Sequence, residues 1–93
     1  MIRSFKGRRS ALVMARRRCR GMSPGIQRVA FRKLAILDAA DVLPDLRVPP
    51  GNRLEKLAGR RAGQYSIRIN DQWRICFVWR RGDAYDVEIV DYH

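Results

Sequence analysis

The residues with the clearest chemical potential stand together in the last three positions of the sequence, Asp91, Tyr92 and His93. His93 is the single histidine among 93 residues, and an imidazole can both accept and donate a proton near neutral pH. The triplet follows an apolar stretch that predicts a core strand, so we expect these side chains to be anchored at the end of a sheet. A solvated polar tail that happens to contain a histidine fits the composition equally well.

Acid–base groups of this kind are suited to cleaving RNA without a metal ion. The reaction needs a base for the ribose 2′-hydroxyl, cations for the charge that develops on the phosphate, and an acid for the departing 5′-oxygen. Because the 2′-hydroxyl is an internal nucleophile, positioning and electrostatics can supply much of the rate. Ser66, Arg68 and Arg74 alternate with apolar residues and could converge on one polar surface, although the ordinary polar face of a sheet shows the same pattern.

The sequence does not predict a cofactor site, a metal site or a disulfide framework. It has no phosphate-cradling glycine motif, nucleophile elbow or metal-ligand spacing, so we expect neither a cofactor nor a metal ion. Cys19 and Cys76 are too few and too far apart to suggest a zinc site or a disulfide framework, and we expect both to be reduced.

Positive charge is concentrated in the first third of the chain. Twenty Lys and Arg oppose nine Asp and Glu, for a net charge of +11. Residues 1–33 hold eleven of the basic residues and no acidic one, which leaves nine of each sign in residues 34–93. Guanidinium groups bind phosphate oxygens through a bidentate fork and stack on bases. We therefore expect a nucleic acid ahead of an acidic protein as partner, although an acidic antagonist would use the same field, and basic helices can simply be solvated.

Length and hydropathy indicate one globular domain over residues 1–93. With 46% apolar residues, the chain is too hydrophobic for a disordered polymer. No apolar run approaches the roughly 20 residues of a membrane span, and the apolar stretch at residues 11–15 is too short for a signal-peptide core. We predict a cytoplasmic protein without a membrane partner.

The hydrophobic pattern changes its period along the chain, which predicts an α+β fold. Residues 2–5 alternate and predict a short strand, residues 4–20 predict a basic helix, and residues 26–40 predict an amphipathic helix. Residues 41–52 contain three prolines and a glycine and predict a connection without a long regular element.

Three stretches of alternating hydrophobicity follow and predict an antiparallel meander joined by short turns: residues 64–69, 73–79 and 84–90. We expect a two-layer fold in which the N-terminal strand and a helical hairpin pack on this antiparallel sheet.

Several stretches resemble the HigB branch of the RelE/ParE toxin superfamily, and together they extend over nearly the whole chain. They are Met-Ile-Arg-Ser-Phe-Lys at residues 1–6, Gly-Gln-Tyr-Ser-Ile-Arg-Ile-Asn at 63–70, Trp-Arg-Ile at 73–75, Gly-Asp-Ala-Tyr at 82–85, and the terminal Asp-Tyr-His. The resemblance implies a RelE-like fold and a toxin of a type II toxin–antitoxin system. It further implies a metal-independent endoribonuclease that enters the A site of the 30S ribosomal subunit, cuts messenger RNA, and is held inactive by a HigA-like helix-turn-helix antitoxin.

The resemblance also implies roles for individual residues. The family's catalytic Asp, Tyr and His fall on Asp91, Tyr92 and His93, and its arginine after the strand tryptophan falls on Arg74. The family's asparagine before that tryptophan is replaced by Gln72, which keeps the amide on a longer arm. We expect RNA contacts from Gln72 and from a set of hydroxyl and basic side chains: Lys56, Arg60, Arg61, Ser66 and Arg68.

One stretch departs from the family pattern. Members commonly read Leu-His-Pro-Leu-Lys-Gly-Asp or Leu-Glu-Ala-Leu-Lys-Gly-Asp where residues 54–60 read Leu-Glu-Lys-Leu-Ala-Gly-Arg. The lysine implicated in catalysis is replaced by Ala58, and the aspartate by Arg60. Losing a cation that stabilises phosphate charge can cost on the order of 100-fold in rate, so an attenuated nuclease is expected. Strand alternation would place Lys56 and Arg60, but not Arg61, on the side of position 58.

Two other functions stay open on the sequence. A ParE-like inhibitor of DNA gyrase would share the fold and need no lysine at position 58, but a terminal histidine adds nothing to that mechanism. A non-catalytic module that binds RNA or DNA would use the basic helices, and its affinity would fall steeply with salt because counterions are released.

Overall fold

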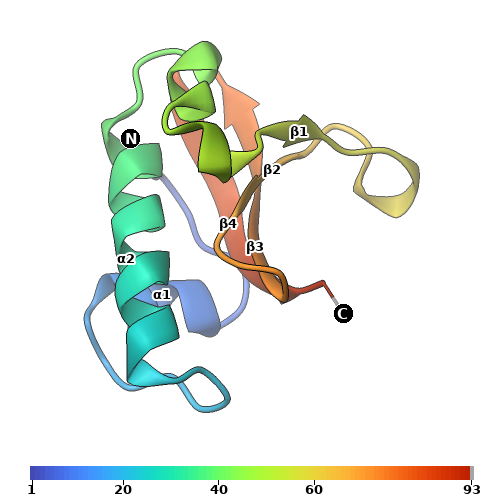
Figure 1. Ribbon diagram of the computed structural model, residues 1–93. Helices are drawn as coiled ribbons and strands as arrows, with labels where there is room; N and C mark the ends of the chain where they lie inside the picture. Colours follow the sequence, from blue (N-terminus) through green and yellow to red (C-terminus); the bar gives the residue numbers. More distant parts are fainter. Residues whose placement is uncertain (93) are drawn as a thin grey trace.

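The computed structural model describes residues 1–92, which form two helices packed against one face of a four-stranded antiparallel sheet (Figure 1). Helix α1 spans Arg9–Met14 and helix α2 spans Pro24–Ala39. Two short 3-10 helices, η1 at Leu43–Arg47 and η2 at Pro50–Asn52, lead from α2 into the sheet, as expected for the proline-rich connection. The predicted two-layer α+β architecture is confirmed.

The sheet has the strand order β1-β2-β3-β4. The three predicted strands correspond to β2, β3 and β4, and a fourth strand, β1, has only two residues. A third 3-10 helix, η3 at Gly59–Arg61, lies between β1 and β2. Strand β1 spans Glu55–Lys56 and β2 spans Tyr65–Arg68. Strand β3 spans Trp73–Arg80 and β4 spans Asp83–Asp91. So short a strand as β1 leaves no periodic signal in the sequence, because it exists only through its pairing with β2.

The N-terminal segment differs from the prediction. The expected strand at residues 2–5 is reduced to two isolated parallel bridges to β4, Ile2 with Ala84 and Phe5 with Val87. The expected helix over residues 4–20 is wrong, since α1 has six residues. Residues up to 6 are held by β4, and Arg16, at φ +57°, adopts a left-handed conformation just after α1 that an α-helix cannot continue.

Helix α2 agrees with the predicted amphipathic helix at residues 26–40 to within two residues at its start. The Ser23 hydroxyl accepts a hydrogen bond from the Ile26 N–H, and Pro24 occupies the first helical position. Leu34 and Leu37 on its inner face are completely buried. They pack with equally buried strand residues in one core cluster.

Alternation gives the sheet two faces of different character. Ile67, Ile75 and Phe77 point into the core shared with α2 and are fully buried. The other face, which we call the polar face, carries residues that lie opposite one another in the strand register: Glu55, Ser66, Arg68, Arg74, Cys76 and Glu88. No helix in residues 1–92 is long and apolar enough to cross a membrane.

Candidate active site on the polar face

Arg74 is the central cation of the polar face and is only 8% exposed. Its Nε donates to the Ser66 hydroxyl at 2.9 Å, and its Nη2 donates to the backbone carbonyl of Arg53 at 2.8 Å. The Glu55 carboxylate is 3.8 Å from Nη2, and the Glu55 side chain is 54% exposed. Two neutral acceptors therefore orient this guanidinium at hydrogen-bond distance, while its ion pair with Glu55 is longer and partly open to solvent.

Tyr92 lies directly beside Arg74. The Arg74 guanidinium carbon is 5.7 Å from the centroid of the Tyr92 ring, within the range of a cation–π contact. The Tyr92 N–H donates to the Gln72 carbonyl at 2.6 Å, which fixes the backbone one residue beyond β4. Tyr92 is nevertheless 46% exposed, so part of its ring is open for stacking.

Asp91 does not share the face of Arg74 and Tyr92. In the strand register Asp91 pairs with Trp73, whereas Val90 pairs with Arg74, so alternation turns Asp91 to the other side of β4. Its Oδ2 accepts a hydrogen bond from Gln72 Nε2 at 3.2 Å. Gln72 thereby contacts both Asp91 and the backbone of Tyr92, and it links the β2–β3 turn to the end of β4. His93 lies outside the described residues.

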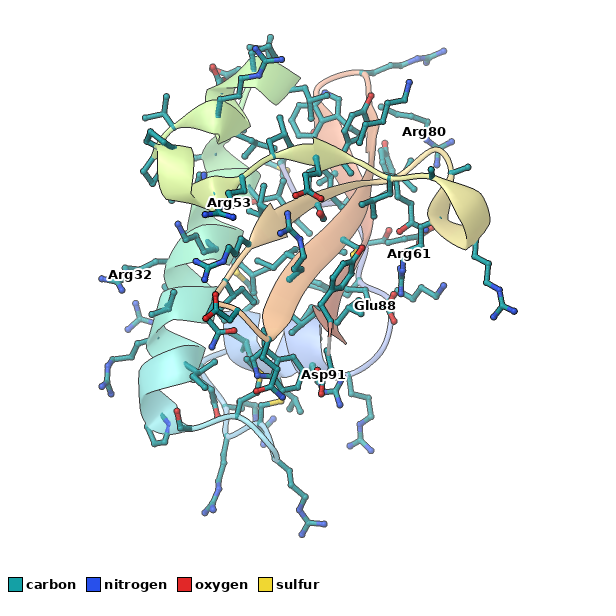
Figure 2. The ribbon with its side chains drawn as sticks, turned by 45° about the vertical axis from the view of Figure 1, so that its right-hand side comes forward. Arg32, Arg53, Arg61, Arg80, Glu88 and Asp91 are labelled. Carbon is teal, nitrogen blue, oxygen red and sulfur yellow. The ribbon has the colours of Figure 1, made fainter. Side chains whose placement is uncertain are left out.

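Arg61 is a further cation that reaches the polar face, from outside its strands. Its Nη1 donates to Glu88 Oε1 and to Gln64 Oε1, both at 3.1 Å, and Figure 2 shows it beside Glu88. The expectation that strand alternation extends through position 60 is wrong, because Gly59–Arg61 form a 3-10 helix. The turn brings Arg61, not Arg60, over the sheet, and Arg60 is exposed.

The remaining predicted RNA contacts fall in different places. Ser66 is completely buried, so its hydroxyl positions Arg74 and is not presented to a ligand at the surface. Lys56 pairs with Tyr65 and therefore lies on the opposite face from Ser66. Arg68 pairs in register with Arg74 and forms an ion pair with the exposed Asp71.

Cys76 lies within the polar face, and the sequence suggested no role for it. It is completely buried, and burial raises the pKa of its thiol. The charge of Glu88 also raises this pKa, while Arg61 and Arg74 lower it. At neutral pH the thiol is protonated, so Cys76 acts as a packing residue and not as a nucleophile.

Sequence reasoning missed three contributors to the site: Glu55, Glu88 and the Arg53 carbonyl. Glu88 had a signal, because it alternates with Val87 and Ile89 in a predicted strand. The Arg53 carbonyl had none, since any residue type supplies one. Within residues 1–92, no group of three or more His, Cys, Asp or Glu side chains is arranged to hold a metal ion.

Comparison of the sequence with known proteins places this chain in a family. The sequence model of a RelE-like toxin of the type II toxin–antitoxin system HigB matches residues 13–93. The chain belongs to this family of HigB-like toxins. It is 50% identical to Toxin HigB-1 of Vibrio cholerae over 68 residues. These residues make up 73% of this chain and 72% of that protein. It is 34% identical to Endoribonuclease HigB of Proteus vulgaris over 94 aligned residues, which cover both chains in full. Membership in this toxin–antitoxin family implies an antitoxin as partner.

Proposed function

We propose that this HigB-like toxin is a metal-independent endoribonuclease that cuts messenger RNA in the ribosomal A site and so stops translation in the cytoplasm. The observation that carries the proposal is the contact between Arg74 and Tyr92, which sets a positioned cation beside a half-exposed aromatic ring. The name of the Proteus vulgaris relative, Endoribonuclease HigB, supports the same activity. The antitoxin in this proposal is a HigA-like helix-turn-helix protein.

In the proposed reaction the ribose 2′-oxygen attacks the adjacent phosphorus, and the bond from phosphorus to the 5′-oxygen breaks. The products are a 2′,3′-cyclic phosphate and a free 5′-hydroxyl. Arg74 binds the phosphate and stabilises the negative charge that develops on its oxygens. His93 serves as the base for the 2′-hydroxyl or as the acid for the 5′-oxygen, and Tyr92 stacks on a neighbouring base or aids the other proton transfer. Asp91 orients Gln72, with which it shares a hydrogen bond.

A second region supports association with ribosomal RNA. A groove of about 1170 Å³ lies between α2 and the loop that follows α1. We call it the arginine groove, after the basic side chains in its lining: Arg16, Arg17, Arg18, Arg28 and Arg32. Because residues 1–33 contain no acidic residue, this groove attracts polyanions.

The proposed cleavage is slower than that of relatives with a lysine at position 58. Ala58 supplies no cation, and the nearby Arg61 is already engaged by Glu88 at 3.1 Å. An ion pair with a carboxylate reduces the positive charge that Arg61 offers to a phosphate. Arg74 therefore lacks the second cation that the family pattern implies at position 58.

The experiment that tests the proposal compares the wild type with His93→Ala and with a chain that lacks Tyr92 and His93. Each is added to ribosomes programmed with a defined messenger, and cleavage is mapped by primer extension. We expect both variants to lose cleavage and growth inhibition while circular dichroism shows an intact fold. Arg81→Ala, at the exposed turn between β3 and β4, is the matched surface control and should cleave like the wild type.

Retained cleavage in His93→Ala would contradict the proposed chemistry. Uncut message together with gyrase-dependent DNA breaks would instead identify a gyrase inhibitor. Uncut message with RNA binding that is unaffected by His93→Ala would identify a non-catalytic binding module.

A further inference from the structure

A cavity of about 370 Å³ lies between α2 and the edge of β2. The edge is open at this point because β1 pairs only with Tyr65 and Ser66, which leaves Arg68 without a β1 neighbour. Three cations line the cavity: Arg32, Lys33 and Arg68. The rest of the lining is apolar or glycine and contains no carboxylate: Val29, Ile36, Pro49, Gly51 and Ile69.

The Lys33 ammonium is held by a built network. Its Nζ donates to Asn52 Oδ1 at 2.5 Å, and Asn52 is completely buried. The Asn52 amide nitrogen in turn donates to the carbonyls of Leu46 and Val48, both at 3.2 Å. A buried amide fixed by two backbone carbonyls thus orients the lysine, so the cation is preorganised before any ligand arrives.

The cavity adjoins the polar face through two consecutive residues. Asn52 accepts from Lys33, and the carbonyl of the next residue, Arg53, accepts from Arg74 Nη2 at 2.8 Å. Arg68 also pairs with Arg74 across β2 and β3. In Figure 2 Arg53 lies close to α2, and Arg32 extends outward from α2. One short segment therefore positions a cation of the cavity and the central cation of the polar face.

The charges in the cavity repel one another in the absence of an anion. The pKa of Lys33 is lowered first by burial and then by the charges of Arg32 and Arg68. Arg68 has the exposed Asp71 as a counter-charge, but neither that carboxylate nor any other belongs to the lining of the cavity. A ligand with negatively charged oxygens would relieve this repulsion and accept hydrogen bonds from Lys33 and Arg68.

We propose that Lys33 and Arg68 form a second phosphate-binding site, which takes the phosphate of the RNA strand that neighbours the one bound by Arg74. This site rests on the proposed RNA substrate but not on cleavage. It holds the strand across the edge of β2 and so sets which phosphate lies at Arg74. Lys33 and Asn52 are then residues that position the substrate, with Asn52 acting through Lys33.

The test uses a 2′-O-methyl RNA hexamer, which has the phosphates but lacks the nucleophilic hydroxyl and cannot be cut. Its Kd is measured by fluorescence anisotropy over a series of salt concentrations. Lys33→Met should raise the Kd about tenfold, because a charge-assisted hydrogen bond is lost. It should also reduce the salt slope by about 0.7, the loss of one phosphate contact on a single strand. Lys33→Arg, which keeps the charge, should restore most of the affinity.

The matched control is Lys6→Met, which removes the same charge from an exposed residue near α1. It should change the Kd by less than Lys33→Met does at every salt concentration. Equal effects of the two substitutions would overturn the site, because they would show a general loss of charge. Since the hexamer cannot be cleaved, this result is independent of whether His93→Ala abolishes cleavage.

A measurement on the wild type keeps the test valid if a variant does not fold. The hexamer should shift the side-chain amide signals of Asn52 in an NMR titration, and it should raise the pKa of Lys33 toward its ordinary value. Inorganic phosphate at the same concentration should leave these signals in place, because it lacks the neighbouring phosphate bound by Arg74. Equal shifts with inorganic phosphate would show that the site binds a free anion and not a phosphate of the RNA strand, which would overturn the proposal. The absence of a shift with the hexamer would overturn it as well.

Discussion

The polar face and the arginine groove both carry positive charge, but they hold it in opposite ways. On the polar face, Arg74 is fixed by Ser66 and by the Arg53 carbonyl, and Arg61 by Glu88 and Gln64. In the arginine groove, no ion pair to a carboxylate is formed by the lining arginines among residues 1–92. A cation fixed by several hydrogen bonds can stabilise charge at one defined point, whereas exposed cations without a carboxylate partner mainly raise the rate of encounter. The comparison therefore predicts kcat effects on the polar face and salt-dependent KM effects in the groove.

The largest expected effect comes from Arg74→Lys, which keeps the positive charge but removes the fork of N–H donors on the guanidinium group. A lysine cannot donate to both the Ser66 hydroxyl and the Arg53 carbonyl while facing a phosphate. We expect kcat for ribosome-dependent cleavage to fall on the order of 100-fold. A near wild-type kcat would show that charge alone suffices, which would remove the distinction between the two regions.

The second largest effect is an increase in kcat, which we expect from Ala58→Lys. The substitution restores a cation close to the polar face that is not tied to Glu88, so kcat should rise about tenfold with little change in KM. The matched control is Ala62→Lys, which adds the same charge just beyond η3. Equal gains from both substitutions would indicate long-range attraction and not a positioned cation.

A smaller effect is expected from replacing Arg16, Arg17 and Arg18 together with glutamine. Association should weaken, so kcat/KM should fall about fivefold at 50 mM salt and much less at 200 mM, where these exposed charges are screened. The value of kcat measured at saturation should stay unchanged. A fall in kcat of similar size would mean that the groove takes part in positioning the RNA.

The smallest effect concerns Cys76, whose thiol is buried in the polar face without a role in the chemistry. Cys76→Ala should change kcat by less than about twofold, because the group is uncharged at neutral pH. In the wild type, iodoacetamide should label Cys76 much more slowly than free cysteine, as followed by peptide mass mapping. The folded chain holds the thiol proton more tightly than the unfolded chain does, so the free energy of unfolding should fall as pH rises past the ordinary thiol pKa. Rapid labelling at pH 7 would contradict the burial of this side chain.

The sequence alone determined those secondary-structure elements that depend on residues close together along the chain. The alternation of residues 64–69, 73–79 and 84–90 predicted β2, β3 and β4, and the helical stripe at residues 26–40 predicted α2. Both patterns are local, because each residue's place follows from the period of its own segment. The uneven charge likewise follows from the sequence, and the resemblance of its motifs indicated the HigB-like family that the comparisons confirmed.

The tertiary structure decided which side chains meet. It shortened α1 because β4 holds the residues that precede it, and it created β1 through pairing with β2. It replaced strand alternation by a 3-10 turn, which brought Arg61 over the sheet. It also buried Ser66 beneath Arg74 and set Tyr92, but not Asp91, beside that arginine. These outcomes depend on contacts between residues far apart in the chain, and a pattern read along one segment contains no information about its partner.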